Sequence, residues 1–183
     1  MCSDFVLIRH GESTWNAAGL WQGHGDAPLS ERGRRQARSL AVELAEEAPT
    51  RLLASDLARA RETAEIVGRE LGLAVELEPG FRELDVGEWS GLTASEVRRR
   101  WPEEVARLRA GDPDLRAGGA ESWSQLRTRA LAAFERWAQR STGCAAVVTH
   151  GGLLRMLLGV ELGNAEWRRA ALAELRGDPV AGL

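Results

Sequence analysis

Lysine and tyrosine are both absent from this chain of 183 residues, and all 24 of its basic residues are arginine. Without lysine, the chain can neither form a lysine Schiff base nor supply the lysine of a Walker A phosphate-binding loop. The formal net charge is −3. We therefore expect no general binding of nucleic acid through a basic surface.

Cysteine and long apolar runs are also scarce. Cys2 and Cys144 lie far apart and form no C-x-x-C pair, which is typical of reduced thiols in a cytoplasmic protein. The N-terminal residues lack the basic and apolar regions of a secretory signal. No apolar run approaches the roughly 20 residues that span a membrane. We expect a cytoplasmic protein without membrane contact, and the length favours one domain over residues 1–183.

The chain alternates between short apolar runs and amphipathic segments. Strand-like runs lie at 4–8, 51–54, 74–77 and 145–149, and a weaker one lies at 170–175. Helical spacing is found after Ser30, after the pair Ser55-Asp56 up to Gly72, from Thr93, from about Trp123 and from Gly151 to about Leu158. This alternation predicts an α/β fold, a three-layer α/β/α sandwich with a mostly parallel central sheet.

Polar residues follow three of the predicted strands, in the segments Arg9-His10, 55–59 and Thr149-His150. The carboxyl ends of parallel strands meet at one edge of a sheet, so we expect these segments to form a site there. A metal site is one alternative, but the chain has no H-x-H or H-E-x-x-H pattern. An arginine beside His10 favours an anion such as phosphate instead. We interpret His24 as an ordinary surface or core histidine.

Five segments, in this order, resemble the signature of the histidine phosphatase superfamily, in its phosphoglycerate-mutase-like branch. They are LIRHGESTWN (7–16), QGHGDAPLSERGRRQA (22–37), SDLARARETA (55–64), FRELDVGEWSGL (81–92) and VTHGG (148–152). They run from the first predicted strand to the helix that follows His150.

The resemblance implies a role for each matched residue. His10 would be the nucleophile that forms a phosphohistidine, and Glu83 would act first as general acid and then as general base. Arg9, Arg59 and His150 would bind the phosphoryl oxygens, with a protonatable His150 adding positive charge. The pocket would also be lined by Asn16, Gln22, Gly23 and Gly151, with a weaker contribution from Ser13. Glu12 is left with a supporting role, such as ordering Arg9 or nearby backbone.

The implied reaction is hydrolysis of a small phosphorylated metabolite without metal or cofactor, with an acidic or near-neutral pH optimum. Cofactor-dependent phosphoglycerate mutases of the same family are the alternative. They usually carry tyrosine and a lysine-bearing stretch after the acid glutamate, and this chain lacks both residue types. A non-catalytic phosphate-binding protein is a further alternative, although His10, Glu83 and His150 are all present. A homodimer through a sheet edge or a helix also stays open.

Several features lie outside these assignments. The segment GGAES (118–122) has one alanine more than the family's Gly-Gly-Glu-Ser, which leaves the roles of Glu121 and Ser122 open. We expect residues 84–122 to cover the pocket and set specificity. Tryptophans 15, 21 and 89 are candidates for its walls, and arginines 98–100 are interpreted as a solvated helix surface.

Overall fold

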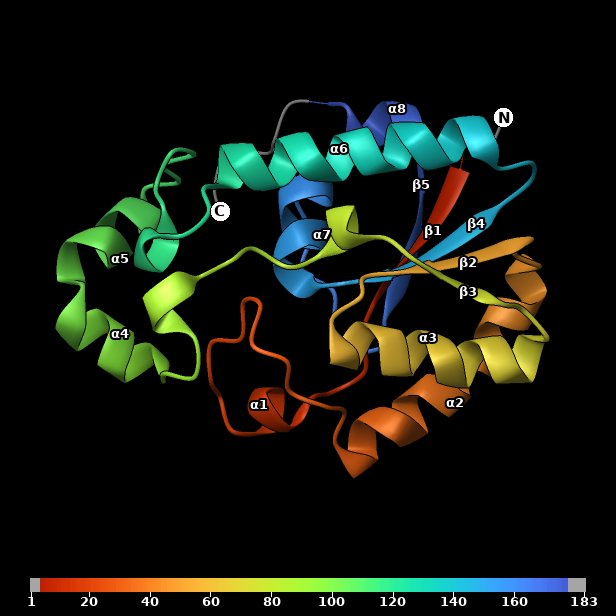
Figure 1. Cartoon of the computed structure of the whole chain (residues 1–183), viewed down its shortest axis with the longest axis horizontal. Helices are drawn as coiled ribbons and strands as arrows, with labels where there is room; N and C mark the ends of the chain where they lie inside the picture. Colours follow the sequence, from red (N-terminus) through yellow and green to blue (C-terminus); the bar gives the residue numbers. More distant parts are fainter. Residues whose placement is uncertain (1–3, 178–183) are drawn as a thin grey trace.

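A computed structural model describes residues 4–177. Its centre is a five-stranded sheet in the order β3-β2-β4-β1-β5 (Figure 1). The strands are β1 (Asp4–Arg9), β2 (Arg51–Ala54), β3 (Val75–Leu77), β4 (Ala145–Thr149) and β5 (Trp167–Ala171). All neighbouring strands are parallel except β5, which is antiparallel to β1. The predicted mostly parallel sheet is confirmed.

Helices connect and cover the strands. The α-helices are α1 (Thr14–Ala17), α2 (Glu31–Glu47), α3 (Ala58–Leu71), α4 (Ala94–Arg100), α5 (Pro102–Arg109), α6 (Trp123–Arg140), α7 (Gly151–Leu158) and α8 (Leu172–Leu175). Short 3-10 helices are η1 (Pro79–Phe81), η2 (Gly87–Trp89) and η3 (Ala117–Gly119). Within residues 4–177, no helix has the length and apolar character needed to cross a membrane.

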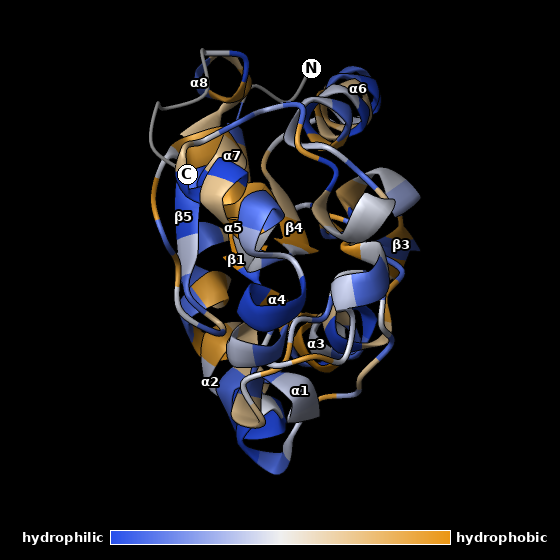
Figure 2. Ribbon diagram, turned by 90° about the vertical axis from the view of Figure 1, so that its left-hand side faces the viewer, coloured by the Kyte–Doolittle hydropathy of each residue, from blue (hydrophilic) through white to orange (hydrophobic). Residues whose placement is uncertain are grey.

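Successive side chains of β1 and β4 point alternately into two hydrophobic cores, one on each face of the sheet. Phe5 and Val147 face a core shared with α6 and α7. Val6 and Val148, one residue further along each strand, face a core shared with α2 and α3. Figure 1 shows these two groups of helices on opposite sides of the sheet, and in Figure 2 β4 has hydrophobic colouring while the outlying α4 is largely hydrophilic. The predicted three-layer sandwich is confirmed.

Two of the predicted boundaries are wrong. Helix α3 is not capped by Ser55-Asp56, since its N-cap is Leu57, which makes no side-chain capping bond. The predicted strand at 170–175 is wrong as well, because β5 ends at Ala171 and residues 172–175 form α8. The sequence of β5, WRRAA, carries two arginines on the edge of the sheet, so it lacks the apolar run that marks the inner strands. Cys2 and residues 178–183 lie outside the described residues.

The strand register determines where the site lies. Arg9 at the end of β1 is paired with Thr149 at the end of β4, and Ala54 at the end of β2 is paired with Val148. The residues that follow these strand ends are therefore neighbours at one edge of the sheet.

Candidate active site

His10 and His150 lie side by side where β1 and β4 end. Their ring centroids are 5.1 Å apart, and both residues are buried. The backbone N–H of His10 donates to the carbonyl of Thr149 at 3.0 Å, which continues the pairing of the two strands. The prediction that these two strand ends meet is confirmed.

The His10 ring is held in one tautomer. Nδ1 lies 2.7 Å from the carbonyl oxygen of Gly11. A carbonyl can only accept, so Nδ1 carries the proton and Nε2 keeps its lone pair. Burial and the charge of Arg59 are the main causes that hold the pKa of His10 well below 6.5. The imidazole is therefore neutral near pH 7, with its unprotonated nitrogen at Nε2.

Arg59 projects from the first turn of α3 and is buried. Its Nε donates to Nε2 of His10 at 3.2 Å, and Nη1 and Nη2 each donate at 2.8 Å, to the carbonyls of Gly25 and Gly23. Burial lowers the pKa of Arg59 to about 10, so the side chain stays charged at neutral pH. Gly23 has φ of +49°, and a Cβ there would lie 2.6 Å from a methyl group of Val86. Only a glycine at position 23 therefore allows this turn to place its carbonyl against the guanidinium of Arg59.

Arg9 is the second cation at this edge of the sheet. Its Nη1 donates to the carbonyl of Leu162 at 2.6 Å, whereas its buried Nε has no hydrogen-bond partner within residues 4–177. A Cβ on Gly151 would lie 3.1 Å from the Nε of Arg9. The glycine at the first position of α7 therefore leaves room for this guanidinium.

His150 presents one nitrogen without a partner. Its Nε2 lies 2.8 Å from the hydroxyl of Ser55, which accepts from the backbone N–H of Leu57. Ser55 can therefore donate its own proton to Nε2, which leaves Nδ1 as the protonated nitrogen. Nδ1 is buried and has no partner in the described part of the chain. Burial and Arg59 hold the pKa of His150 well below 6.5. In the free protein this residue thus offers a neutral N–H donor and not the extra positive charge expected from the sequence.

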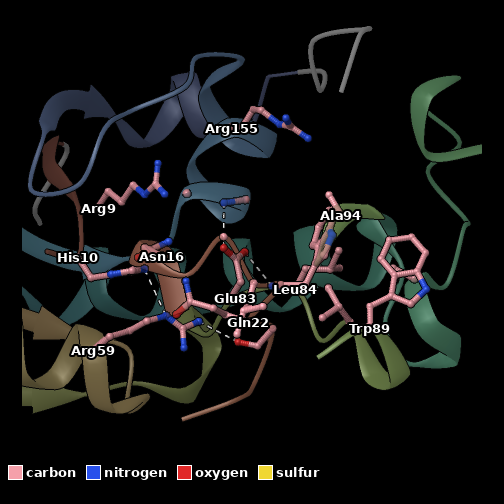
Figure 3. Close-up of a pocket in the computed structure, with 18 of the residues that line it drawn as sticks. Arg9, His10, Asn16, Gln22, Arg59, Glu83, Leu84, Trp89, Ala94 and Arg155 are labelled. Atoms are coloured by element: carbon pink, nitrogen blue, oxygen red, sulfur yellow. Dashed lines mark hydrogen bonds between the residues drawn. The ribbon is translucent and has the colours of Figure 1, made fainter. Parts of the chain in front are cut away.

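Glu83 faces the N-terminus of α7. Its Oε1 accepts the backbone N–H groups of Leu84 and Leu153 at 2.9 and 3.1 Å, and Oε2 accepts that of Gly152 at 2.9 Å. A Cβ on Gly152 would lie 2.5 Å from Oε1. Because Gly151 and Gly152 have no side chains, Arg9 and Glu83 can lie directly against the start of this helix. Figure 3 shows Glu83 in the same cavity as His10 and Arg59.

The other predicted pocket residues differ in position. Asn16, Gln22, Gly23 and Gly151 line the cavity, whereas Ser13 does not appear in its wall. Ser13 is buried and caps α1, with its hydroxyl 2.7 Å from Oε1 of Gln22 and accepting the N–H of Asn16 at 3.0 Å. It positions the two side chains that reach the cavity. Asn164, which the sequence did not single out, donates to the carbonyl of His10 at 3.1 Å.

The cavity has a volume of about 360 Å³, with a polar end at His10 and Arg59 and a largely apolar wall beyond it (Figure 3). Its apolar wall consists of Leu20, Trp21, Leu84, Val86, Trp89, Ala94, Leu108, Ala117 and Trp123. Most of these come from residues 84–122, the segment expected to cover the pocket. Of the three tryptophans considered for the wall, Trp21 and Trp89 line the cavity. Trp15 does not line it and packs against Gly25 and Gly91. Arg98, Arg99 and Arg100 are exposed on α4, in agreement with a solvated surface.

An ion pair behind Glu83 was missed in the sequence. Arg129 binds both oxygens of Glu121, at 2.6 and 2.9 Å, and also donates to the carbonyl of Glu83 at 2.7 Å. Glu121 accepts the backbone N–H of Asp85 at 3.1 Å. The Glu121 role left open by the extra alanine is therefore to hold the loop that carries Glu83. Ser122 caps α6.

The sequence signal for Arg129 was its place on α6. It lies three residues after Leu126 and four before Ala133, on the buried face of the helix. An arginine there needs a partner.

The structure gives His24 and Glu12 supporting contacts. His24 lies 2.9 Å from the carbonyl of Glu83 through its Nε2, so it supports the same loop. Glu12 accepts from the Ser30 hydroxyl at 2.7 Å and pairs with Arg32 at 3.3 Å. It therefore orders the start of α2, and no bond to Arg9 is found in residues 4–177. The same residues contain no cluster of three or more His, Cys, Asp or Glu that could hold a metal ion.

Comparisons with known proteins agree with this geometry. The sequence profile of the histidine phosphatase superfamily (branch 1) matches residues 5–176. A metal-independent phosphoserine phosphatase of Arabidopsis thaliana is 39% identical over 159 residues, which cover 85% of this chain and 67% of that protein. A probable phosphoglycerate mutase GpmB of Photorhabdus laumondii is 39% identical over 163 residues, which cover 86% of this chain and 74% of that protein.

Solved structures show the same fold. A mycobacterial glucosyl-3-phosphoglycerate phosphatase, in complex with VO3, superposes with a TM-score of 0.84 at 29% identity and covers 92% of both chains. The profile match spans nearly the whole described chain, and two relatives exceed 30% identity over most of their length. The chain therefore belongs to branch 1 of the histidine phosphatase superfamily and is an enzyme of that family.

Proposed function

We propose that this enzyme hydrolyses phosphomonoesters without a metal ion, through a phosphohistidine on His10 and with Glu83 as general acid and base. The observation that carries the proposal is the tautomer of His10. The Gly11 carbonyl holds the proton on Nδ1, and Nε2 keeps a lone pair, which accepts the Nε–H of the charged Arg59.

In the first step, Nε2 of His10 attacks phosphorus and forms the P–N bond, while the ester P–O bond breaks. The transition state spreads charge over the equatorial phosphoryl oxygens. The unpartnered Nε of Arg9 and the unpartnered Nδ1 of His150 are N–H donors for that charge. The Nε–H of Arg59 donates to Nε2 of His10 in the free protein and is released to an equatorial oxygen when Nε2 bonds to phosphorus. Because the positions of these three side chains are set by other bonds, little reorganisation is needed at the moment of reaction.

The leaving oxygen takes its proton from Glu83. Oε2 of Glu83 accepts one backbone bond, from Gly152, and so retains a lone pair that can carry this proton. Departure of the alcohol leaves Glu83 ionised. In the second step Glu83 removes a proton from water, the water oxygen attacks phosphorus and the P–N bond breaks. The products are inorganic phosphate and neutral His10, and Glu83 is again protonated.

The relatives support this class of reaction, because one is a phosphatase described as metal-independent and another is a phosphatase solved with VO3. The GpmB relative is described as a probable mutase. In a mutase the phosphoryl group passes from histidine to a second phosphoglycerate in place of water. The lack of lysine and tyrosine favours hydrolysis in this chain.

The test is turnover of p-nitrophenyl phosphate in the presence of EDTA. We expect activity that persists in EDTA and is lost in His10→Ala. Rapid acid-free quenching should give an intermediate in which the peptide that contains His10 gains the mass of one phosphoryl group. Activity that survives in His10→Ala, or that EDTA abolishes, contradicts the proposal. Faster conversion of 3- to 2-phosphoglycerate with 2,3-bisphosphoglycerate than release of phosphate would assign the mutase reaction instead.

A further inference from the structure

Arg155 lines the cavity, yet the proposed reaction gives it no task. It lies in the last turn of α7. Its Nε is buried and has no hydrogen-bond partner within residues 4–177, and no ion pair of this side chain is found there. Buried guanidinium nitrogens are ordinarily bonded, so an unpaired one in a cavity wall points to a ligand.

Helix α7 places Arg155 on the same face as the two glycines at its start. Arg155 lies four residues after Gly151, which adjoins Arg9, and three after Gly152, which adjoins Glu83. Residues at these spacings lie on one face of a helix, and one turn rises about 5 Å. Figure 3 accordingly shows Arg155 apart from Arg9, His10 and Arg59. The backbone of Arg155 is therefore about one helical turn along α7 from the two glycines that adjoin Arg9 and Glu83.

The surroundings leave the charge of Arg155 unbalanced. The cavity wall beyond the phosphate end is largely apolar, with Trp21 and Trp123 among its members. Glu161 is the other charged residue of that part of the wall; it is exposed and forms no ion pair with Arg155 in the described residues. A cation in a mostly apolar wall attracts an anionic part of a ligand.

We propose that Arg155 binds a carboxylate on the alcohol part of the substrate, so that the enzyme prefers small phosphorylated acids to neutral phosphomonoesters. This inference rests on the proposed function, since the phosphate must lie at His10. A guanidinium presents parallel N–H groups that match the two oxygens of a carboxylate. Arg9 and Arg155 line the same cavity, so a small ligand with both a phosphate and a carboxylate has a cation for each group.

The test compares 3-phosphoglycerate with glycerol 3-phosphate, which differ in a carboxylate against a hydroxymethyl group. We expect the wild type to have the higher kcat/KM on 3-phosphoglycerate. Arg155→Met should lower this preference about 10- to 100-fold, mainly through KM, because a charge-assisted hydrogen bond is lost. Arg155→Lys keeps the charge and should retain part of the preference. Arg38→Met is the matched control, since Arg38 is exposed on α2 and makes no bond in the described residues.

Each result decides the inference. An equal loss on both substrates would assign Arg155 a structural role and overturn it, as would a wild type without preference for the acid. Arg155→Gln serves if Arg155→Met does not fold. His10-dependent turnover of p-nitrophenyl phosphate without this preference would refute the inference alone. Turnover that survives His10→Ala would refute the proposed function, and the inference with it.

Discussion

The Nε atom of Arg59 lies 3.2 Å from Nε2 of His10, so a buried cation touches the nitrogen that attacks in the proposed reaction. Carbonyls of Gly23 and Gly25 hold the far side of the guanidinium. A phosphoryl group in front of Nε2 therefore meets a donor whose direction is already fixed. The same contact contributes to the low pKa of His10. Burial and Arg59 together thus keep the proposed nucleophile neutral, and Arg59 lies beside the atom that would attack.

Arg59→Met should lower kcat/KM on p-nitrophenyl phosphate by about 100- to 1,000-fold, as the loss of a transition-state donor does in other enzymes. The kcat/KM of the Arg59→Lys variant should fall nearly as far, because an ammonium cannot reach both glycine carbonyls and His10 at once. Steady-state kinetics check this, with circular dichroism to establish that each variant is folded. A loss below tenfold in Arg59→Met would show that Arg59 does not bind the transferred group.

The stability of the protein should fall as the pH is lowered below 6.5. His10 and His150 have folded-state pKa values well below 6.5, mainly through burial. In the unfolded chain they take up protons near pH 6.5, whereas in the folded chain they stay neutral. The unfolded state therefore binds more protons, and each histidine removes roughly 1 kcal/mol of unfolding free energy per pH unit until its folded pKa is reached.

Urea denaturation at several pH values between about 8 and 5 measures this slope. His10→Asn removes one of the two titrating groups and should reduce the slope by about half. Val42→Ala is the control, because this exposed side chain on α2 has no ionisable group and should leave the slope unchanged. A slope that does not change in His10→Asn would contradict the assignment of a neutral, buried imidazole.

The central part of the fold could be predicted from local patterns. The runs at 51–54 and 145–149 are strands with the predicted bounds, because inner parallel strands are apolar on both faces. His10 and His150 could be brought together by the rule for strand ends alone. Strand β5 could not be predicted, since an edge strand with exposed arginines has no such pattern.

The supporting contacts of the site depend on pairs that sequence spacing does not reveal. Ser55 at the start of a helix is equally well explained as a cap, and only the structure brings it to His150, 95 residues away. Arg129, which pairs with Glu121, also contacts the loop that carries Glu83. The sequence of α6 alone does not indicate this contact. Arg155 was missed because an arginine near a helix C-terminus is explained by the helix dipole.

Glu83→Gln should separate the two proposed steps. Release of p-nitrophenolate needs little protonation, so His10 can still be phosphorylated, but no base remains to activate water. We expect a burst of about one p-nitrophenol per enzyme, followed by a steady rate about 100- to 10,000-fold below wild type. Stopped-flow absorbance measures the burst. A linear trace at a nearly wild-type rate would show that Glu83 is not the base.

Arg129→Met should lower both stability and activity, although Arg129 does not line the cavity. The change leaves the carbonyls of Gly80, Arg82 and Glu83 without this donor and Glu121 without its cation. We expect a loss of about 3 kcal/mol in unfolding free energy, because both partners are largely shielded from water. The fall in kcat should exceed the change in KM, since the loop that positions Glu83 loosens while the phosphate-binding residues stay in place.

The matched control is Arg107→Met, which removes an exposed ion pair with Asp112 and should change little. In a double-mutant cycle, Glu121→Gln combined with Arg129→Met should be less harmful than the sum of the two single changes, because each already removes the same contact. Urea denaturation and steady-state kinetics on the four proteins measure this coupling. Additive effects on kcat would contradict the view that the pair acts on Glu83 as one unit.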